Sequence, residues 1–184
     1  MTRISLITTL AVGLACVPAC SRDTVDDRAV ATPQATQINA TDENFVQDMA
    51  QGGNLEVALG QLAATRAVDP RVKEFGQRMA SDHGSTGAEL QSLAAQKQIS
   101  VETALNDDNR DKEQDLSTKS GTDFDKAYIS QMVDAHQETV SRVEKEANDG
   151  ADPQLKAFAQ KVLPTVQEHL RMARELDARL SASR

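Results

Sequence analysis

Three histidines are the residues of this chain best suited to bind a metal ion. His83, His136 and His169 are the only histidines, and each lies on the apolar face of a different predicted helix. Each has a methionine within four positions, namely Met79, Met132 and Met172. Neutral imidazole nitrogens bind zinc and copper, and thioether sulfur also binds copper. The spacing therefore predicts that three imidazoles converge inside a helical bundle and bind a transition metal.

A carboxylate from a fourth helix would add to this site. Glu56 lies at a similar depth along its own predicted helix, so we expect it to be a fourth ligand. Met79 and Met132 are candidate soft ligands. Carboxylates near the histidines would accept hydrogen bonds from ring N–H groups, and the candidates are Asp82, Asp134 and Glu168. The Glu-x-x-His motif of di-iron bundles is absent, so we expect copper or zinc before iron.

The same residues fit a second interpretation, in which no metal binds. Buried histidines are commonly held by hydrogen bonds, here to Glu56, Asp82 or Asp134, and methionine is a common filler of apolar cores. The chain would then be a non-catalytic structural or interaction module. No serine or threonine is placed beside a histidine by a known nucleophile–base motif, so an enzyme is the least favoured class.

The elements that carry these residues are predicted to be helices. Apolar residues recur at helical spacing over 41–67, 70–98, 122–148 and 153–180, and a shorter helix is expected near 109–118. Asp69-Pro70 and Asp152-Pro153 each supply a cap followed by proline at the first helical position. Gly52-Gly53 is expected to interrupt or bend the first helix, and Pro164 to kink the last. The fold class is therefore all-α.

An internal repeat predicts how the helices are connected. DPRVKEFGQRM (69–79) aligns without gaps with DPQLKAFAQKV (152–162). The chain therefore resembles two αα-hairpins joined by a long crossover over 99–121, which is the arrangement of a ferritin-like four-helix bundle. We expect this crossover to make the third long helix parallel to the first and to place both hairpin turns at one end.

The positions along the helices then predict the depth of each candidate ligand. A helix rises about 1.5 Å per residue, which places His83 and His136 roughly 21–23 Å from the hairpin turns. Glu56 falls at roughly 18 Å, and His169 at roughly 28 Å, a turn deeper. One candidate ligand from each long helix is thus expected near one level of the bundle.

The N-terminus predicts export. Residues 1–19 are predicted to be a signal peptide. Their apolar run follows a short start that carries Arg3, and it is too short to span a membrane. The run ends in Val-Pro-Ala-Cys, which resembles a lipobox with Cys20 as the lipidated residue. Cys16 is a second candidate that fits the pattern less well. Cleavage near Ala19 without lipidation would instead release a secreted protein. Ser21 after Cys20 indicates sorting to the outer membrane. Residues 20–41 are expected to be a flexible tether and 42–182 the helical domain.

The charge of the chain limits its partners. The net charge is -8, and it becomes -9 once Arg3 is lost with the signal peptide. Acidic proteins are repelled by nucleic acids and anionic membrane surfaces, so we expect no nucleic-acid partner and a membrane contact through the lipid alone. Both cysteines precede the domain, which must therefore be held by its hydrophobic core without a disulfide.

Several motifs occur in order along residues 42–176: Gly-Gly-x-x-Glu at 52–56, Asp82-His83, Phe124-Asp125, Asp134-Ala135-His136, and Leu163-Pro164 before His169. In these the chain resembles the DUF4142 family of predicted outer-membrane proteins. The resemblance implies a ferritin-like bundle and an envelope location, and it implies no established reaction. A related periplasmic ferritin-like family has metal-binding members, so metal handling is inferred by analogy only.

Overall fold

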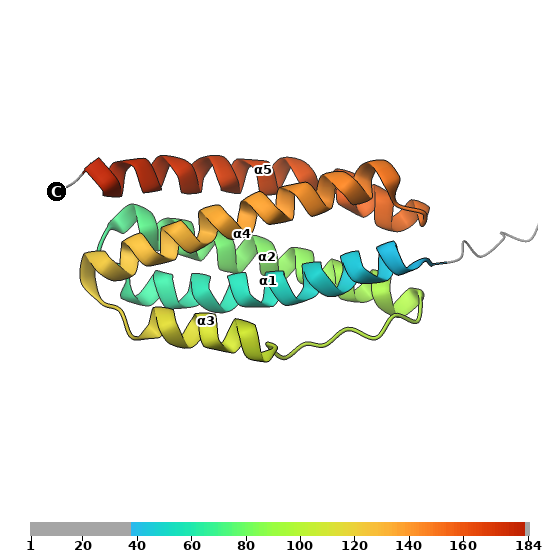
Figure 1. Cartoon of the computed structure of the whole chain (residues 1–184), viewed down its shortest axis with the longest axis horizontal. Coiled ribbons are helices and arrows are strands. Elements are labelled where there is room, and N and C mark those ends of the chain that lie inside the picture. The colour runs from blue at the N-terminus through green and yellow to red at the C-terminus, as the bar shows by residue number, and fades with distance from the viewer. Residues whose placement is uncertain (1–37, 183–184) are drawn as a thin grey trace, which may run out of the picture. The chain divides into compact units, whose positions relative to one another are not determined.

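The protein is an α-helical bundle, described here from a computed structural model that covers residues 38–182 (Figure 1). The expected all-α fold is confirmed. Five helices follow one another along this part of the chain: α1 (Ala40–Arg66), α2 (Pro70–Gln96), α3 (Asp107–Ser117), α4 (Gly121–Asp149) and α5 (Pro153–Ala182). Residues 38–182 belong to one compact unit that contains both hydrophobic clusters of the core. The predicted signal peptide, Cys20 and most of the predicted tether lie outside the described residues.

The four long helices form two hairpins whose turns lie at opposite ends of the bundle (Figure 1). The Asp125 carboxylate, near the start of α4, accepts the backbone N–H groups of Val68 and Asp69 in the α1–α2 turn, at 3.1 and 2.7 Å. At the other end, Asp42 near the start of α1 accepts the N–H groups of Ala151 and Asp152 in the α4–α5 turn.

The expected orientation of the third long helix was therefore wrong: α4 is antiparallel to α1 and parallel to α2 (Figure 1). The reason is the direction of the crossover. The segment between α2 and α4, including α3, runs back to the end of the bundle at which α2 began, and α4 starts from there (Figure 1). The expected short helix within the crossover is present as α3.

The helix starts follow from their capping residues. Asn39 caps α1 by accepting the N–H of Asp42, and the Asp42 carboxylate accepts the Asn39 N–H in return. This helix therefore begins at Ala40, one residue before the expected start at 41. Asp69 caps α2 as predicted. The carboxylate of Asp152 accepts the N–H groups of two residues in the first turn of α5.

Two apolar clusters fill the core, and the histidines lie between them along the helices. Met79 on α2, Met132 on α4 and Ala173 on α5 belong to the first cluster. Leu90, Val143 and Val162 on the same three helices belong to the second. Each histidine falls between these two positions in its own helix, so a polar layer divides the apolar core.

The α1–α2 hairpin is closely packed at one crossing. A Cβ atom placed on Gly60 would lie 2.7 Å from the Gly76 carbonyl oxygen, and one on Gly76 would lie 2.8 Å from the Gly60 carbonyl oxygen. The two backbones thus approach too closely for any larger residue. By contrast, α1 continues through Gly52-Gly53 without the expected interruption, and α5 remains one helix through Pro164.

Candidate metal centre

The structure brings the three histidine rings together in the interior of the bundle. His83, His136 and His169 are all buried, and their ring centroids are 5.3–5.5 Å apart. One ring nitrogen of each histidine lies within 4.8 Å of the other two. They come from α2, α4 and α5, so the group exists only when both hairpins are packed together.

His169 lies level with the other two histidines, although counting residues placed it a turn deeper. Side chains of an α-helix lean toward its N-terminus. His136 precedes the α4–α5 turn and leans away from it, whereas His169 follows the turn and leans back toward it. This opposite lean brings the two rings to within 5.5 Å of each other.

Glu56 from α1 points into the bundle and lies beside two of the histidines. Only 3% of this residue is exposed. Its Oε2 atom is 3.0 Å from Nδ1 of His83, and its Oε1 atom is 3.5 Å from Nδ1 of His136. The Nδ1 atom of His136 is also 2.9 Å from the backbone oxygen of Met132. Glu56 thus approaches both rings from their Nδ1 side.

The other nitrogens of these two rings face each other. Nε2 of His83 is 3.3 Å from Nε2 of His136. Two imidazole nitrogens that share a tetrahedral ion at about 2.0–2.1 Å are separated by about 3.3–3.4 Å. The observed spacing therefore equals that of two ligands of one metal ion, and it also suits one proton shared between the rings.

His169 is held through one nitrogen and leaves the other without a partner. Its Nε2 atom is 2.9 Å from Oδ2 of Asp82, so this nitrogen carries the proton. Its Nδ1 atom is buried and contacts no hydrogen-bond partner among residues 38–182. A buried lone pair without a donor costs about 1–3 kcal/mol.

Burial keeps the layer uncharged. It raises the pKa of Glu56 to about 8 and lowers the pKa of His83 to about 3 and of His136 to about 4; repulsion by neighbouring histidines adds to the lowering. Burial also lowers the pKa of His169, although the neighbouring Asp82 carboxylate acts in the opposite direction and raises it. At neutral pH a protonated Glu56 can therefore donate a hydrogen bond to Nδ1 of His83. The Nε2–H of His83 can then donate to Nε2 of His136, and the Nδ1–H of His136 to the Met132 carbonyl.

The remaining predicted site residues have other surroundings. Asp134 is exposed, and Glu168 on the surface of α5 pairs with Arg171 at 2.7 Å. Met79 and Met132 are fully buried in the first apolar cluster, and Met172 packs half-buried against it. Of the carboxylates expected to hold the rings, Asp82 therefore contacts a histidine, whereas Asp134 and Glu168 lie on the surface.

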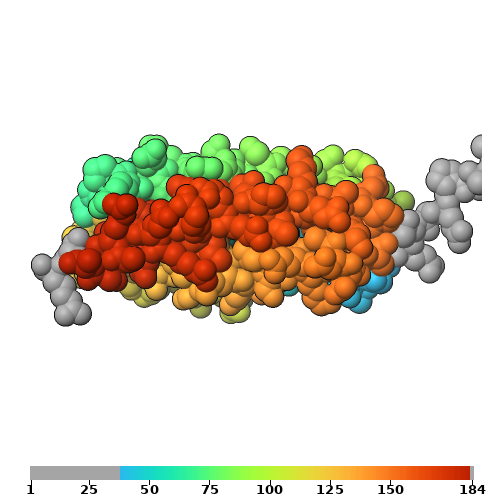
Figure 2. Space-filling model, turned by 90° about the horizontal axis from the view of Figure 1, so that it is seen from above, coloured from blue at the N-terminus to red at the C-terminus, as the bar shows by residue number. Residues whose placement is uncertain are grey.

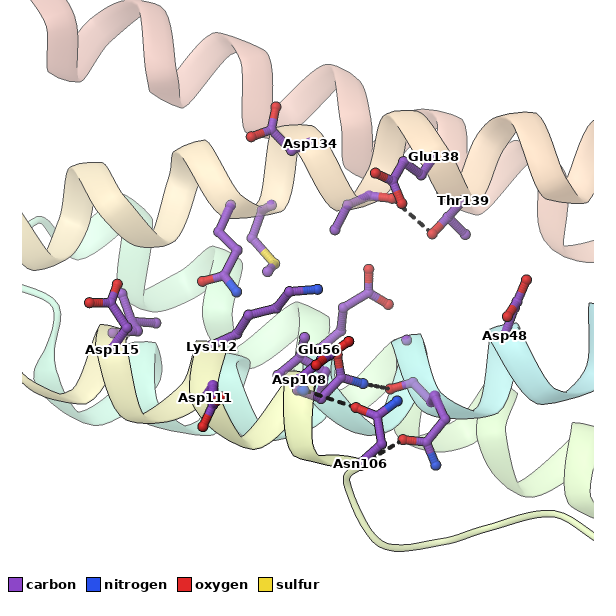
Figure 3. A pocket seen from close by; sticks show the side chains of 18 of the residues that line it. Asp48, Glu56, Asn106, Asp108, Asp111, Lys112, Asp115, Asp134, Glu138 and Thr139 are labelled. Carbon is purple, nitrogen blue, oxygen red and sulfur yellow. Dashed lines mark hydrogen bonds between the residues drawn. The ribbon is translucent and has the colours of Figure 1, made fainter.

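A pocket that the sequence did not reveal leads from the surface to Glu56. It has a volume of about 810 Å³ and lies between α1, α3 and α4 (Figure 3). Two basic residues, Lys112 and Arg142, line the pocket. Besides Glu56, six acidic residues also line it: Asp48, Asp108, Asp111, Asp115, Asp134 and Glu138. Its acids come from three helices, so sequence spacing alone could not group them. The run of aspartates over 107–115 was the sequence feature that could have indicated an acidic site here.

The crossover that forms one wall of this pocket is held against α1. The side-chain amide of Gln51 donates to the backbone oxygens of Glu102 and Ala104, and its oxygen accepts the N–H of Asn106. Asn109, at the start of α3, donates back to the Gln51 backbone oxygen at 3.1 Å. These contacts fix α3 beside α1.

Comparison with known proteins identifies the fold and the family. A Deinococcus radiodurans DUF305 fragment has a TM-score of 0.68 at 14% identity, over 77% of this chain and 98% of its own. A candidate secreted protein of Streptomyces coelicolor, also DUF305, has a TM-score of 0.66 at 15% identity, over 77% of this chain and 94% of its own. At this identity the likeness concerns the fold alone.

The search of curated proteins found no match. Among residues 38–182, none of the helices has the length and apolar character needed to cross a membrane. The family model described as a domain of unknown function, DUF4142, matches residues 27–176. The chain therefore belongs to the DUF4142 family.

Proposed function

We propose that this protein is an envelope metal-binding protein that sequesters or carries one transition-metal ion on His83, His136 and His169. The ligand atoms would be Nε2 of His83, Nε2 of His136 and Nδ1 of His169. Each is the ring nitrogen opposite the one that contacts an acceptor. Metal-binding histidines usually donate their second N–H in this way, which fixes the orientation of the ring.

The observation that carries the proposal is the buried, unpartnered Nδ1 atom of His169. The metal-free hydrogen-bond chain from Glu56 through His83 and His136 ends at a carbonyl and needs no third ring. A metal ion bound between the rings would satisfy the His169 nitrogen as well.

Glu56 and Asp82 would support the ion from outside the ligand set. Because Glu56 lies on the Nδ1 side of His83, we now assign it to orienting the rings, in place of the direct ligand expected from sequence. Three neutral imidazoles carry no charge. A divalent cation would displace the proton on Nε2 of His83, and the Glu56 proton would pass to Nδ1 of that ring. The ionised carboxylates of Glu56 and Asp82 would then balance the charge of the ion. Met79 and Met132 remain candidate soft ligands from the adjoining apolar cluster.

The ligand chemistry favours copper or zinc. Three imidazoles suit Zn²⁺ and copper, whereas iron bundles use several bridging carboxylates. We further propose that the protein is exported and anchored to the outer membrane through lipidated Cys20. The signal-like sequence of residues 1–19 supports export, as does the name of the Streptomyces structure, a candidate secreted protein. Mass spectrometry of the membrane-extracted protein would show diacylglycerol on Cys20.

Metal titration tests the site directly. The compact unit 35–184, which contains its own core, would be purified without metal and titrated calorimetrically with Cu(II), Cu(I), Zn(II) and Fe(II). We expect saturable one-to-one binding that His136→Ala and His169→Ala abolish while helicity is retained. Gln137→Ala, an exposed change beside His136, is the control and should bind as the unsubstituted protein does.

A second function is favoured by the neutral hydrogen-bond chain of Glu56, His83 and His136, which is complete without a metal. The protein would then be a structural or interaction module of the envelope. That case predicts no binding tighter than about millimolar, a free energy of roughly -4 kcal/mol. His136→Ala would then act only by destabilising the fold, because it leaves buried polar groups unpaired.

A further inference from the structure

The acidic pocket between α1, α3 and α4 ends at the residue that touches the histidines. Glu56 lines the pocket and also contacts Nδ1 of His83. Its Oε1 atom is buried and accepts no hydrogen bond within residues 38–182. In Figure 3 the Glu56 carboxylate is directed into the pocket between α1 and α4. The Glu56 side chain thus joins the pocket to the histidine layer.

The α4 and α5 sides of the layer offer little access. His136 has no exposed surface and His169 is 1% exposed, whereas His83 on α2 is 6% exposed. Figure 2 shows α5 lying across the face of the bundle between α2 and α4, so the helix that carries His169 also covers that side. An ion that approaches from solvent through the pocket meets Glu56 first.

The charges of the pocket suit a cation. Asp108, Asp111 and Asp134 line it and make no ion pair within residues 38–182, whereas Arg142 is engaged by Asp48 and Glu138. Lys112 extends its side chain into the pocket and forms no ion pair with the residues that the structure describes (Figure 3). Clefts lined by one sign of charge concentrate counter-ions and raise association rates by about 10- to 1,000-fold.

We infer that this pocket is the route by which a hydrated divalent metal cation enters and leaves the histidine centre, with Glu56 as the inner contact. The inference rests on the proposed function. It also assigns a role to Gly52, which lines the pocket one helical turn before Glu56. A Cβ atom on Gly52 would have nothing within 4 Å, so a larger residue can be placed there and would fill the pocket above Glu56.

Stopped-flow measurement of Cu(II) uptake and release by residues 35–184 tests the route. Gly52→Leu should slow association and dissociation together, with the dissociation constant changed less than about threefold, because a barrier on a route acts equally in both directions. Gly84→Leu is the matched control. Gly84 is exposed on α2, lies outside the pocket and also has open space around a Cβ atom.

Charge variants test the same route independently. Neutralising Asp108, Asp111 and Asp134 to asparagine should slow Cu(II) association by roughly tenfold at low ionic strength and weaken its salt dependence. Neutralising three exposed acids outside the pocket is the control: Glu74→Gln, Glu102→Gln and Asp149→Asn. Lys112→Gln should accelerate association, a direction that damage to the fold would not produce.

The outcomes separate the two proposals. Rates equal to those of the unsubstituted protein in both Gly52→Leu and the triple asparagine variant would overturn the route and leave the metal centre intact. Failure of the unsubstituted protein to bind Cu(II) would overturn the centre, and the route with it. A large loss of affinity in Gly52→Leu, with unchanged association, would mean that the leucine disturbs the histidine centre itself and would also overturn the route.

Discussion

Asp42 and Asp125 are equivalent residues of the two hairpins, and each carboxylate accepts two backbone N–H groups from the turn of the opposite hairpin. They lie 83 positions apart, as do Asp69 and Asp152, which start the repeated helices. The sequence repeat therefore extends to the contacts that join the hairpins. Because the two carboxylates act at opposite ends, they fix the antiparallel arrangement of α1 and α4.

Replacing Asp125 should destabilise the fold without changing its helices. Asp125→Asn keeps one acceptor oxygen but loses the charge and leaves an amide facing two backbone donors. We expect the free energy of unfolding to fall by about 2 kcal/mol, measured by urea titration. Asp123→Asn is the control, because Asp123 is exposed two positions earlier in the same helix. Equal stability of the two variants would contradict this role.

The sequence was a good guide to the elements and to the burial of the histidines. The starts of α2 and α5 follow directly from Asp69-Pro70 and Asp152-Pro153. Helical periodicity placed His83, His136 and His169 on buried faces because it depends only on local spacing. The direction of α4 could not be obtained in this way, because it is set by the contacts of Asp42 and Asp125 between distant segments.

The chemistry around the histidines was less accessible to sequence. Asp82 and Asp134 each lie next to or near a histidine in the chain, yet only Asp82 contacts one, at His169 of another helix. Glu56 was expected to be a ligand and was found on the Nδ1 side of His83. Which ring nitrogen meets which partner depends on side-chain geometry, which residue spacing does not contain.

Replacing glycine by alanine should have opposite effects on stability at the close crossing of α1 and α2 and at a position with open space. Gly60→Ala should destabilise by about 1–3 kcal/mol, because its methyl group would collide with the backbone of α2. This exceeds the gain of about 1 kcal/mol from better helix propensity. Gly84→Ala, whose Cβ meets nothing within 4 Å, should stabilise by up to about 1 kcal/mol. Thermal unfolding of both variants would distinguish these signs.

Glu146 should make the stability of the protein depend on pH. Burial, and next the neighbouring Asp42 carboxylate, raise the pKa of Glu146 to about 7 from the ordinary value of 4.5. The folded state therefore keeps a proton that the unfolded state has lost between these two values. The Glu146 contribution to stability is then greatest below pH 4.5 and falls as the pH rises to about 7.

Glu146→Gln isolates this contribution from those of other groups. The amide has a similar shape and does not ionise, so the variant should gain stability relative to the unsubstituted protein as the pH is raised from 5 to 8. Unfolding by urea at several pH values would measure the difference. Glu144→Gln, an exposed change on the same helix, should show no such trend. Parallel pH curves for the Glu146 variant and the unsubstituted protein would refute the assignment.

Asp82 should control metal affinity through His169. Its carboxylate holds Nε2–H of the ring at 2.9 Å, which leaves Nδ1 free to bind the ion. Asp82→Ala should weaken Cu(II) or Zn(II) binding by about tenfold, the lower end of the effect of removing such a partner. Since the Asp82 side chain is 33% exposed, little change in metal-free stability is expected.

Two further variants show whether this effect passes through the ring. Arg78→Gln removes the 3.4 Å contact of Arg78 with Asp82 and leaves the hydrogen bond to His169, so it should retain the affinity. Asp82→Asn keeps an acceptor oxygen for the ring N–H but removes the charge, so it should lose less affinity than Asp82→Ala. An equal loss in the two variants would instead mean that Asp82 acts on the ion by charge alone, without positioning His169.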